Sequence, residues 1–267
     1  MEEASFDFGG ARFDLKKDED RAILRFILSQ ALYGEATGVY CGRSLYAAAT
    51  LEAAQFYVKQ ARQELAHLQL FAEIFRSLDL TPEPAHWVVR ALAAHNDFYP
   101  LKVLMEHALG EGMVLDIFRD VLVATLPDDD LRVPAIKKKL RVICKEEEEH
   151  VAWGEKETRR ILAEKPGYKT AFYGLLELEL SLVPYAVSGL KKMAPEHPVL
   201  KQLDAFVAHV QARVWRQGQA LGFVPDERPG AAKRAWAITR GVALLARSQL
   251  ASSKSQLDKR YLSELGF

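Results

Sequence analysis

Two short Glu/His patterns in the chain have the spacing of metal ligands. Glu64 and His67 are separated by two residues, and Glu147 and His150 repeat that spacing later in the chain. On a helix, residues i and i+3 lie on one face with their Cβ atoms about 5–6 Å apart. A carboxylate and an imidazole placed in this way can ligate one metal ion or flank two.

A further carboxylate precedes each pattern at a distance that suits a helical hairpin. Glu35 precedes Glu64, and Glu111 precedes Glu147, each by enough chain for the rest of one helix, a short turn and half of the next. A four-helix bundle that binds two metals uses two Glu-x-x-His helices and one inward Glu from each of two partner helices. The sequence therefore predicts a two-metal site with six ligands, namely Glu35, Glu64, His67, Glu111, Glu147 and His150.

Each pattern has a simpler interpretation when it is taken alone. Glu64 and His67 could form an exposed polar pair on a helix. The second pattern overlaps the charge run 146–149, which is typical of a solvated face. Neither interpretation explains why both pairs recur with a partner Glu on a preceding apolar helix, where a buried carboxylate is costly unless something compensates its charge.

The ligand on the third helix has a competitor. Glu106 precedes the second Glu-x-x-His pattern by a longer gap, whereas Glu111 has the better spacing and lies between Gly110 and Gly112. Glycine inside a helix costs about 1 kcal/mol relative to alanine. Two glycines here suggest a close neighbouring helix or room for a ligand, and we therefore favour Glu111.

His107 is a seventh candidate ligand. It lies one turn before Glu111 on the same face, so it is either an additional ligand or a hydrogen-bond donor to one. A ring that points to the end of the bundle or to water is the favoured interpretation.

The bulk composition narrows the class of protein. The chain has 267 residues, 49% of them hydrophobic, and a formal net charge of zero. These values indicate a globular protein and give no general argument for nucleic acid or an anionic membrane as partner. Two cysteines do not make a disulfide framework, and neither a signal peptide nor a membrane-spanning apolar run is visible. We expect a soluble, cytoplasmic, mostly helical protein.

The apolar periodicity predicts an all-α fold. We expect an N-terminal arm at 1–19, a four-helix bundle at 20–165 and a helical extension at 166–267 that packs on the bundle. Asp18 or Asp20 is expected to cap the first helix, and Thr50 the second. The expected helices lie near 20–46, 51–78, 85–97, 101–126, 134–163, 168–192, 197–220, 230–250 and 254–265.

The ligand types indicate which metal the site would hold. Four carboxylates and two imidazoles suit iron or manganese better than copper(I) or zinc, which favour soft thiolate ligands. Two dications and four carboxylates make a neutral site that a low-dielectric core can hold. Two iron(II) ions side by side can give O2 two electrons.

The set Glu35, Glu64-x-x-His67, Glu111 and Glu147-x-x-His150 resembles the ligand set of the ferritin-like di-iron carboxylate proteins, over about residues 20–163. The resemblance implies a ferritin-like four-helix bundle with additional C-terminal helices. It also implies that Glu64 and Glu147 bridge two irons and that Glu35 and Glu111 are terminal or shifting ligands. His67 and His150 would each bind one iron. His107, as a ligand, would be similar to the added histidine of the arylamine N-oxygenases, which lies on a different helix.

The resemblance covers several activities. A ferritin subunit needs little beyond the bundle, and this chain continues well past it, so we expect an O2-activating oxygenase or oxidase that hydroxylates or N-oxygenates a small organic or biosynthetic substrate. The alternative is a metal-storage, ferroxidase or peroxide-detoxifying protein without an organic substrate, and a third is a binding subunit without metal. The expected partners are an electron donor, a second copy of the chain and a substrate. The basic stretch 233–260 suggests that the substrate could be a coenzyme A or carrier-protein thioester.

Overall fold

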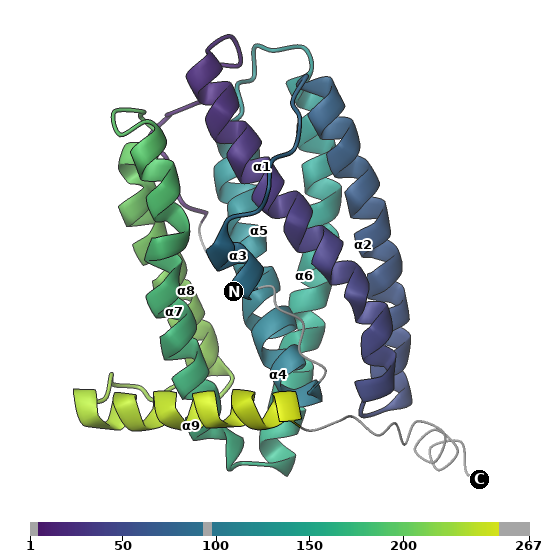
Figure 1. Ribbon diagram of the computed structural model, residues 1–267, viewed down its shortest axis with the longest axis vertical. Coiled ribbons are helices and arrows are strands. Elements are labelled where there is room, and N and C mark those ends of the chain that lie inside the picture. The colour runs from purple at the N-terminus through teal and green to yellow at the C-terminus, as the bar shows by residue number, and fades with distance from the viewer. Residues whose placement is uncertain (1–4, 93–97, 251–267) are drawn as a thin grey trace.

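The protein is helical throughout the part of the chain that the structure describes. The computed structural model describes residues 5–92 and 98–250, and the regular elements within these ranges are all helices (Figure 1). The prediction of an all-α fold is therefore confirmed. No helix within the described ranges is both long and apolar enough to cross a membrane.

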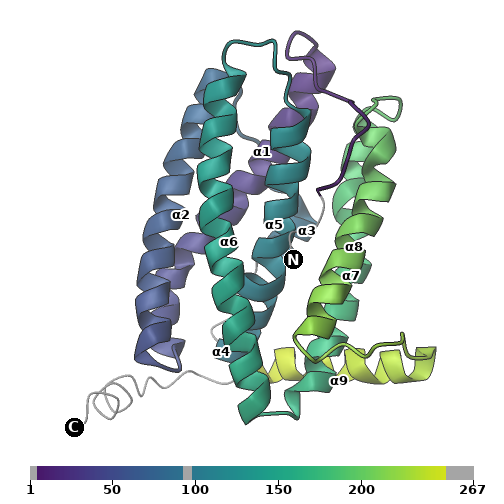
Figure 2. The same cartoon turned by 180° about the vertical axis from the view of Figure 1, so that it is seen from behind.

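The helices that carry the candidate ligands form rods that lie side by side, as Figures 1 and 2 show from opposite sides. Three of the rods are α1 (Asp18–Gly38), α2 (Leu51–Ser77) and α6 (Val133–Glu164). The remaining rod is built from α4 (Tyr99–Lys102), η2 (Val103–Gly110), α5 (Glu111–Asp116) and η3 (Ile117–Val123). Each rod places a stripe of apolar side chains in the shared core, so burial of these stripes drives the assembly.

The first rod differs from its prediction at both ends. Lys17 is the N-cap residue, and neither predicted aspartate caps the helix; Asp18 and Asp20 instead lie in the first turn, where negative charge favours the helix dipole. The α-helix ends at Gly38 and continues as the 3₁₀ helix η1 (Val39–Ala47). The predicted continuous helix to about residue 46 is therefore wrong in its last part.

The second rod follows its prediction closely. The Thr50 side chain accepts a hydrogen bond from the backbone N–H of Ala53, which caps α2. The face of α2 that carries Glu64 and His67 is buried along the helix, including Tyr57, Gln60 and Phe71. Burial of the apolar side chains on this face turns the first Glu-x-x-His pattern inward.

The third rod has the predicted extent but an unexpected backbone. Two of its four segments, η2 and η3, are π-helices, which are wider than an α-helix and rare outside single turns. Gly110 fits the first of them, because a Cβ at this position would lie 2.7 Å from the carbonyl oxygen of Met105. The chain thus needs glycine here to form the π-helical turn that leads to Glu111.

The remaining helices pack beside and below the four rods. They are α3 (Trp87–Leu92), α7 (Tyr168–Met193), the 3₁₀ turn η4 (Leu200–Gln202), α8 (Leu203–Ala220) and α9 (Ala231–Leu250). In Figure 1, α9 runs crosswise under α7. The crossing is close because Gly174 has no Cβ, which would otherwise lie 1.8 Å from the carbonyl oxygen of Ala237. The end of the helix expected at 85–97 and the helix expected at 254–265 lie outside the described residues.

Candidate metal centre

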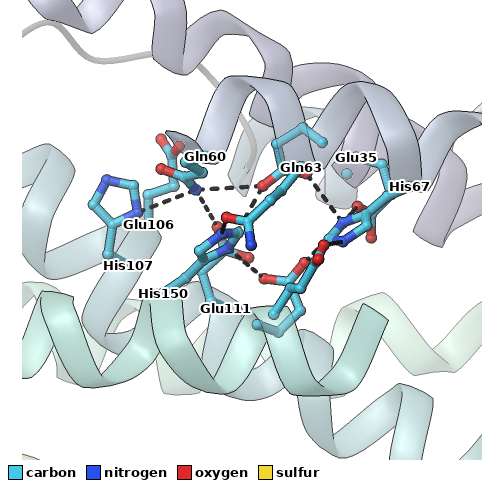
Figure 3. Close-up of polar contacts among 12 residues, drawn as sticks. Glu35, Gln60, Gln63, His67, Glu106, His107, Glu111 and His150 are labelled. Atoms are coloured by element: carbon cyan, nitrogen blue, oxygen red, sulfur yellow. Dashed lines mark hydrogen bonds and ion pairs between the residues drawn. The ribbon is translucent and has the colours of Figure 1, made fainter. Parts of the chain in front are cut away.

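The structure brings the six predicted ligands together in two overlapping groups (Figure 3). The first group, called here the His67 position, consists of Glu35, Glu64, His67 and Glu147. The second group, called the His150 position, consists of Glu64, Glu111, Glu147 and His150. Within each group, one potential ligand atom per residue lies within 4.8 Å of the others. Glu64 and Glu147 belong to both positions.

Each shared carboxylate faces both imidazoles with separate oxygens. Glu64 has Oε2 3.7 Å from Nδ1 of His67 and Oε1 3.7 Å from Nδ1 of His150. Glu147 has Oε1 3.2 Å from Nδ1 of His67 and Oε2 2.9 Å from Nδ1 of His150. Two carboxylates arranged in this way are placed to bridge a pair of neighbouring metal ions.

The two unshared carboxylates lie at opposite ends of the cluster. Glu35, from α1, has Oε2 2.8 Å from Nδ1 of His67. Glu111, the first residue of α5, accepts a hydrogen bond of 3.0 Å from Nε2 of Gln60. Each position therefore has one carboxylate of its own and two that it shares.

A glycine that no sequence pattern singled out makes room for the cluster. Gly38 ends α1 one turn after Glu35, and a Cβ at this position would lie 2.6 Å from Cδ of Glu64. Any larger residue would displace the shared carboxylate. The close approach of α1 to α2 at this point is therefore part of the construction of the site.

The glycine after Glu111 marks a close neighbour. A Cβ at Gly112 would lie 3.2 Å from the guanidinium nitrogens of Arg213, on α8. Of the two explanations that the sequence suggested, the crowding comes from a neighbouring helix. The helix that carries Glu111 is thus packed directly against the C-terminal part of the chain.

Glu106, the competitor for the third-helix ligand, belongs to a different set of contacts. The buried ammonium group of Lys102 pairs with its carboxylate. Glu106 groups with His107 and Glu111, but it is not a member of the His150 position. The structure therefore places Glu111, and not Glu106, beside His150.

Burial gives the cluster unusual electrostatics. His67 and His150 are fully buried, and the side chains of Glu35, Glu64 and Glu147 are at most 3% exposed. Carboxylates removed from water repel one another and are stable only with compensating positive charge. Within the described residues, the two imidazoles are the nearest groups that can supply it.

The pKa values reflect this imbalance of charge. Burial raises the pKa of Glu35 and of Glu111 well above the usual value, and the neighbouring carboxylates of Glu147 and Glu64 raise both further. Burial also opposes the charge of Glu147, but hydrogen bonds with His150 and His67 outweigh it and lower its pKa to about 2. The cluster thus holds more acidic groups than its imidazoles can neutralise, which fits a site for cations.

Two residues that no sequence pattern identified as part of the site hold the imidazoles from outside. Nε2 of His67, on α2, lies 2.7 Å from Oε2 of Glu146 on α6. Nε2 of His150, on α6, lies 3.0 Å from Oε1 of Gln63 on α2. Each outer partner directly precedes the shared glutamate of its own helix, so the repeat extends to one more position. These contacts turn both Nδ1 atoms toward the carboxylates, as is usual for metal-binding histidines.

His107 does not point to water, so that part of the favoured interpretation is wrong. Its ring is fully buried and packs against Phe56 and Trp153, with ring centroids 5.5 Å and 5.2 Å away. Burial lowers its pKa to about 3, which keeps the ring neutral. Nδ1 lies 3.5 Å from Nε2 of Gln60, and Nε2 has no hydrogen-bond partner among the described residues.

Gln60 contacts both His107 and two carboxylates of the cluster (Figure 3). Its Nε2 lies 3.3 Å from Oε1 of Glu64 and 3.0 Å from Oε1 of Glu111, in addition to its contact with His107. Its Oε1 is buried and has no hydrogen-bond partner within the described ranges. The amide therefore orders the Glu111 end of the cluster and links it to His107, which itself groups with Glu106 and Glu111.

The donor set fits a pair of first-row metal ions. Carboxylate oxygens with one imidazole nitrogen per position suit iron or manganese, and none of the described residues adds a thiolate to the cluster. No protein-family model matches the chain, and no curated protein matches it.

Proposed function

We propose that this protein is a non-haem di-iron oxidoreductase of the ferritin-like type, which activates O2 to oxidise a small organic substrate. The observation that carries the proposal is the placement of Glu64 and Glu147, each of which faces His67 and His150 with separate oxygens. Two Glu-x-x-His helices and two helices with a single inward Glu form the ligand pattern of di-iron bundles.

The residues would divide the work of holding two ions. His67 and His150 would each bind one ion through Nδ1, and the shared carboxylates would span both. Glu35 and Glu111 would complete the separate positions. Two iron(II) ions held in this way would supply the electrons that reduce O2. Manganese is the alternative metal for the same ligands.

The surrounding side chains would keep bulk water away from the site. Phe56 and Trp153 stack with their ring centroids 3.8 Å apart, and Phe56 also lies 5.8 Å from the ring of His150. Together with the burial of both imidazoles, this cover favours oxidation chemistry that water would otherwise quench. The cover lies at the His150 position, on the same side as Gln60 and His107.

Two features favour an organic substrate over metal storage. The helix that bears Glu111 is held by α8, through Arg213 and Gln217, and a storage bundle needs no such helix. Oε1 of Gln60 and Nε2 of His107 are buried polar atoms near Glu111 that have no hydrogen-bond partner among the described residues. Buried polar atoms are normally hydrogen-bonded, and polar groups of a bound substrate or water would satisfy them.

The test is consumption of O2 that depends on substrate. The full chain is loaded with iron(II) without oxygen and mixed with O2, with and without arylamines, fatty-acyl thioesters and other small candidates. We expect at least one candidate to accelerate O2 uptake and to yield an oxidised product, and we expect the Glu64→Ala variant to abolish the effect. Rapid ferroxidase or catalase turnover with no response to any candidate would instead support the storage or peroxide-detoxifying alternative.

A further inference from the structure

The two metal positions differ in the groups that hold their imidazoles from outside. The ring of His67 is backed by the carboxylate of Glu146 at 2.7 Å, whereas the ring of His150 is backed by the amide oxygen of Gln63 at 3.0 Å. Both outer partners line one surface groove between α2 and α6. The two outer partners therefore occupy equivalent positions in the internal repeat, but one is a carboxylate and the other a neutral amide.

A charged outer partner strengthens a histidine ligand. An imidazole whose outer N–H donates to a carboxylate is a more basic ligand than one that donates to a neutral acceptor, and removal of such a partner typically costs about 10- to 100-fold in metal affinity. On this ground the His67 position has the stronger imidazole ligand.

The carboxylates of the two positions also favour tighter metal binding at the His67 position. Gln60 donates to Oε1 of Glu111 and approaches Oε1 of Glu64, the oxygen that faces His150. Both oxygens accept hydrogen bonds from the amide N–H of Gln60. A metal ion at the His150 position would therefore compete with Gln60 for these two oxygens. At the His67 position, Glu35 contacts the imidazole itself at 2.8 Å.

We propose that the two positions are inequivalent, with the His67 position binding its ion first and more tightly, because a carboxylate backs its imidazole while a neutral amide backs the other. The proposal rests on the metal centre proposed above and adds an order of loading. It also makes the His150 position, next to His107 and Gln60, the more labile of the two.

The test is an anaerobic titration of the metal-free full chain with cobalt(II), followed by visible absorption and by metal counting. We expect two binding steps whose affinities differ by about 10-fold or more. His150→Ala should remove the weaker step, and His67→Ala should remove the tighter one. A single step with equal affinities, or the opposite assignment of the steps, would overturn the order of loading.

Isosteric exchanges at the outer partners test whether these residues cause the difference in affinity between the two positions. Glu146→Gln should weaken the first step by about 10-fold, and Gln63→Glu should tighten the second by a similar factor. The matched controls are Glu149→Gln and Gln55→Glu, which make the same charge changes on the same helices at exposed sites that do not contact an imidazole. Both controls should leave the two steps unchanged.

The outcomes separate this inference from the proposed function. Two bound ions whose affinities do not respond to exchange of either outer partner would overturn the inference alone. Absence of binding by the unaltered protein would overturn the metal centre itself. A shift of both steps in the exposed-site controls as well would show a general charge effect, which would contradict the role of Glu146.

Discussion

Gln217 on α8 donates a hydrogen bond of 2.7 Å to the backbone carbonyl of Ala108, within the π-helical segment that precedes Glu111. Its own Oε1 accepts a bond of 3.2 Å from Arg213, whose Nε in turn donates to Asp116 at 2.7 Å. The last of these residues ends α5. The helix α8 thus contacts the third rod on both sides of Glu111, before it at Ala108 and after it at Asp116.

Gln217→Leu should weaken metal binding at the His150 position, because the segment before Glu111 loses its hydrogen bond to α8. Loss of a buried hydrogen bond also costs about 1–3 kcal/mol of unfolding free energy. Cobalt(II) titration and thermal unfolding would measure both effects. Gln219→Leu is the matched control on the same helix, since its side chain donates hydrogen bonds to the backbone carbonyls of Pro225 and Asp226, away from Glu111. Equal effects of the two variants on the second binding step would contradict the positioning role.

Glu64→Ala should impair both positions, because Glu64 faces both imidazoles. His150→Ala should impair only the position that it serves. Metal counting after anaerobic loading with iron(II) would report fewer than two ions per chain in each variant, and O2-dependent activity should be lost in both. Far-ultraviolet circular dichroism should remain helical. Two tightly held ions in either variant would refute the assignment of these residues as ligands.

His107→Ala should retain two metal ions, because each position has three carboxylates and one imidazole without it. The cavity left in the aromatic cluster should lower the unfolding free energy by about 2–4 kcal/mol. Metal counting and denaturant unfolding would check the two parts separately. Loss of one ion per chain would instead identify His107 as a ligand.

Glu179 should make the protein less stable as the pH rises. Burial raises the pKa of Glu179 to about 8 from the usual 4.5, and its Oε2 has no hydrogen-bond partner among the described residues. The folded state therefore retains a proton that the unfolded state has released. Its contribution to stability is complete below pH 4.5 and is lost progressively as the pH rises to about 8. Glu179→Gln should remove this dependence and raise the melting temperature at pH 8.

Glu177→Gln is the matched control, because Glu177 is buried on the same helix but charged. Burial opposes its charge, yet hydrogen bonds from Arg228, Tyr173 and Arg234 hold its pKa below the usual value. Its contribution to stability is present above the unfolded pKa and is lost as the pH falls. This exchange should destabilise the protein at pH 7. A stabilising effect as large as that of Glu179→Gln would contradict the assignment of Glu177 as charged and Glu179 as protonated.

The helical fold and the convergence of the six Glu and His side chains could be predicted because both follow from local periodicity. The i, i+3 spacing of Glu64 with His67 and of Glu147 with His150 fixes a shared face on any α-helix, and apolar stripes fix which face turns inward. The pairing of Lys102 with Glu106 is instead a finding of the structure. It argues against Glu106 as the third-helix ligand.

Other features depend on contacts between distant parts of the chain. The bonds of Glu146 to His67 and of Gln63 to His150 join residues that lie far apart in the sequence, on different helices. The π-helical turn before Glu111 depends on Gly110 in a packed environment, and periodicity assumes an α-helix. The burial of His107 follows from packing against Trp153 on another helix. Sequence patterns carry no signal for these partners.

We propose that Glu64 and Glu147 are shared by two metal ions, and anaerobic loading of the metal-free chain with iron(II) tests this sharing most directly. The number of ions per chain after removal of excess metal, compared between the unaltered protein and Glu64→Ala, is the decisive quantity. We expect two ions in the unaltered protein and a deficit at both positions in the variant. One ion or none in the unaltered protein, or two in the variant, would contradict the claim.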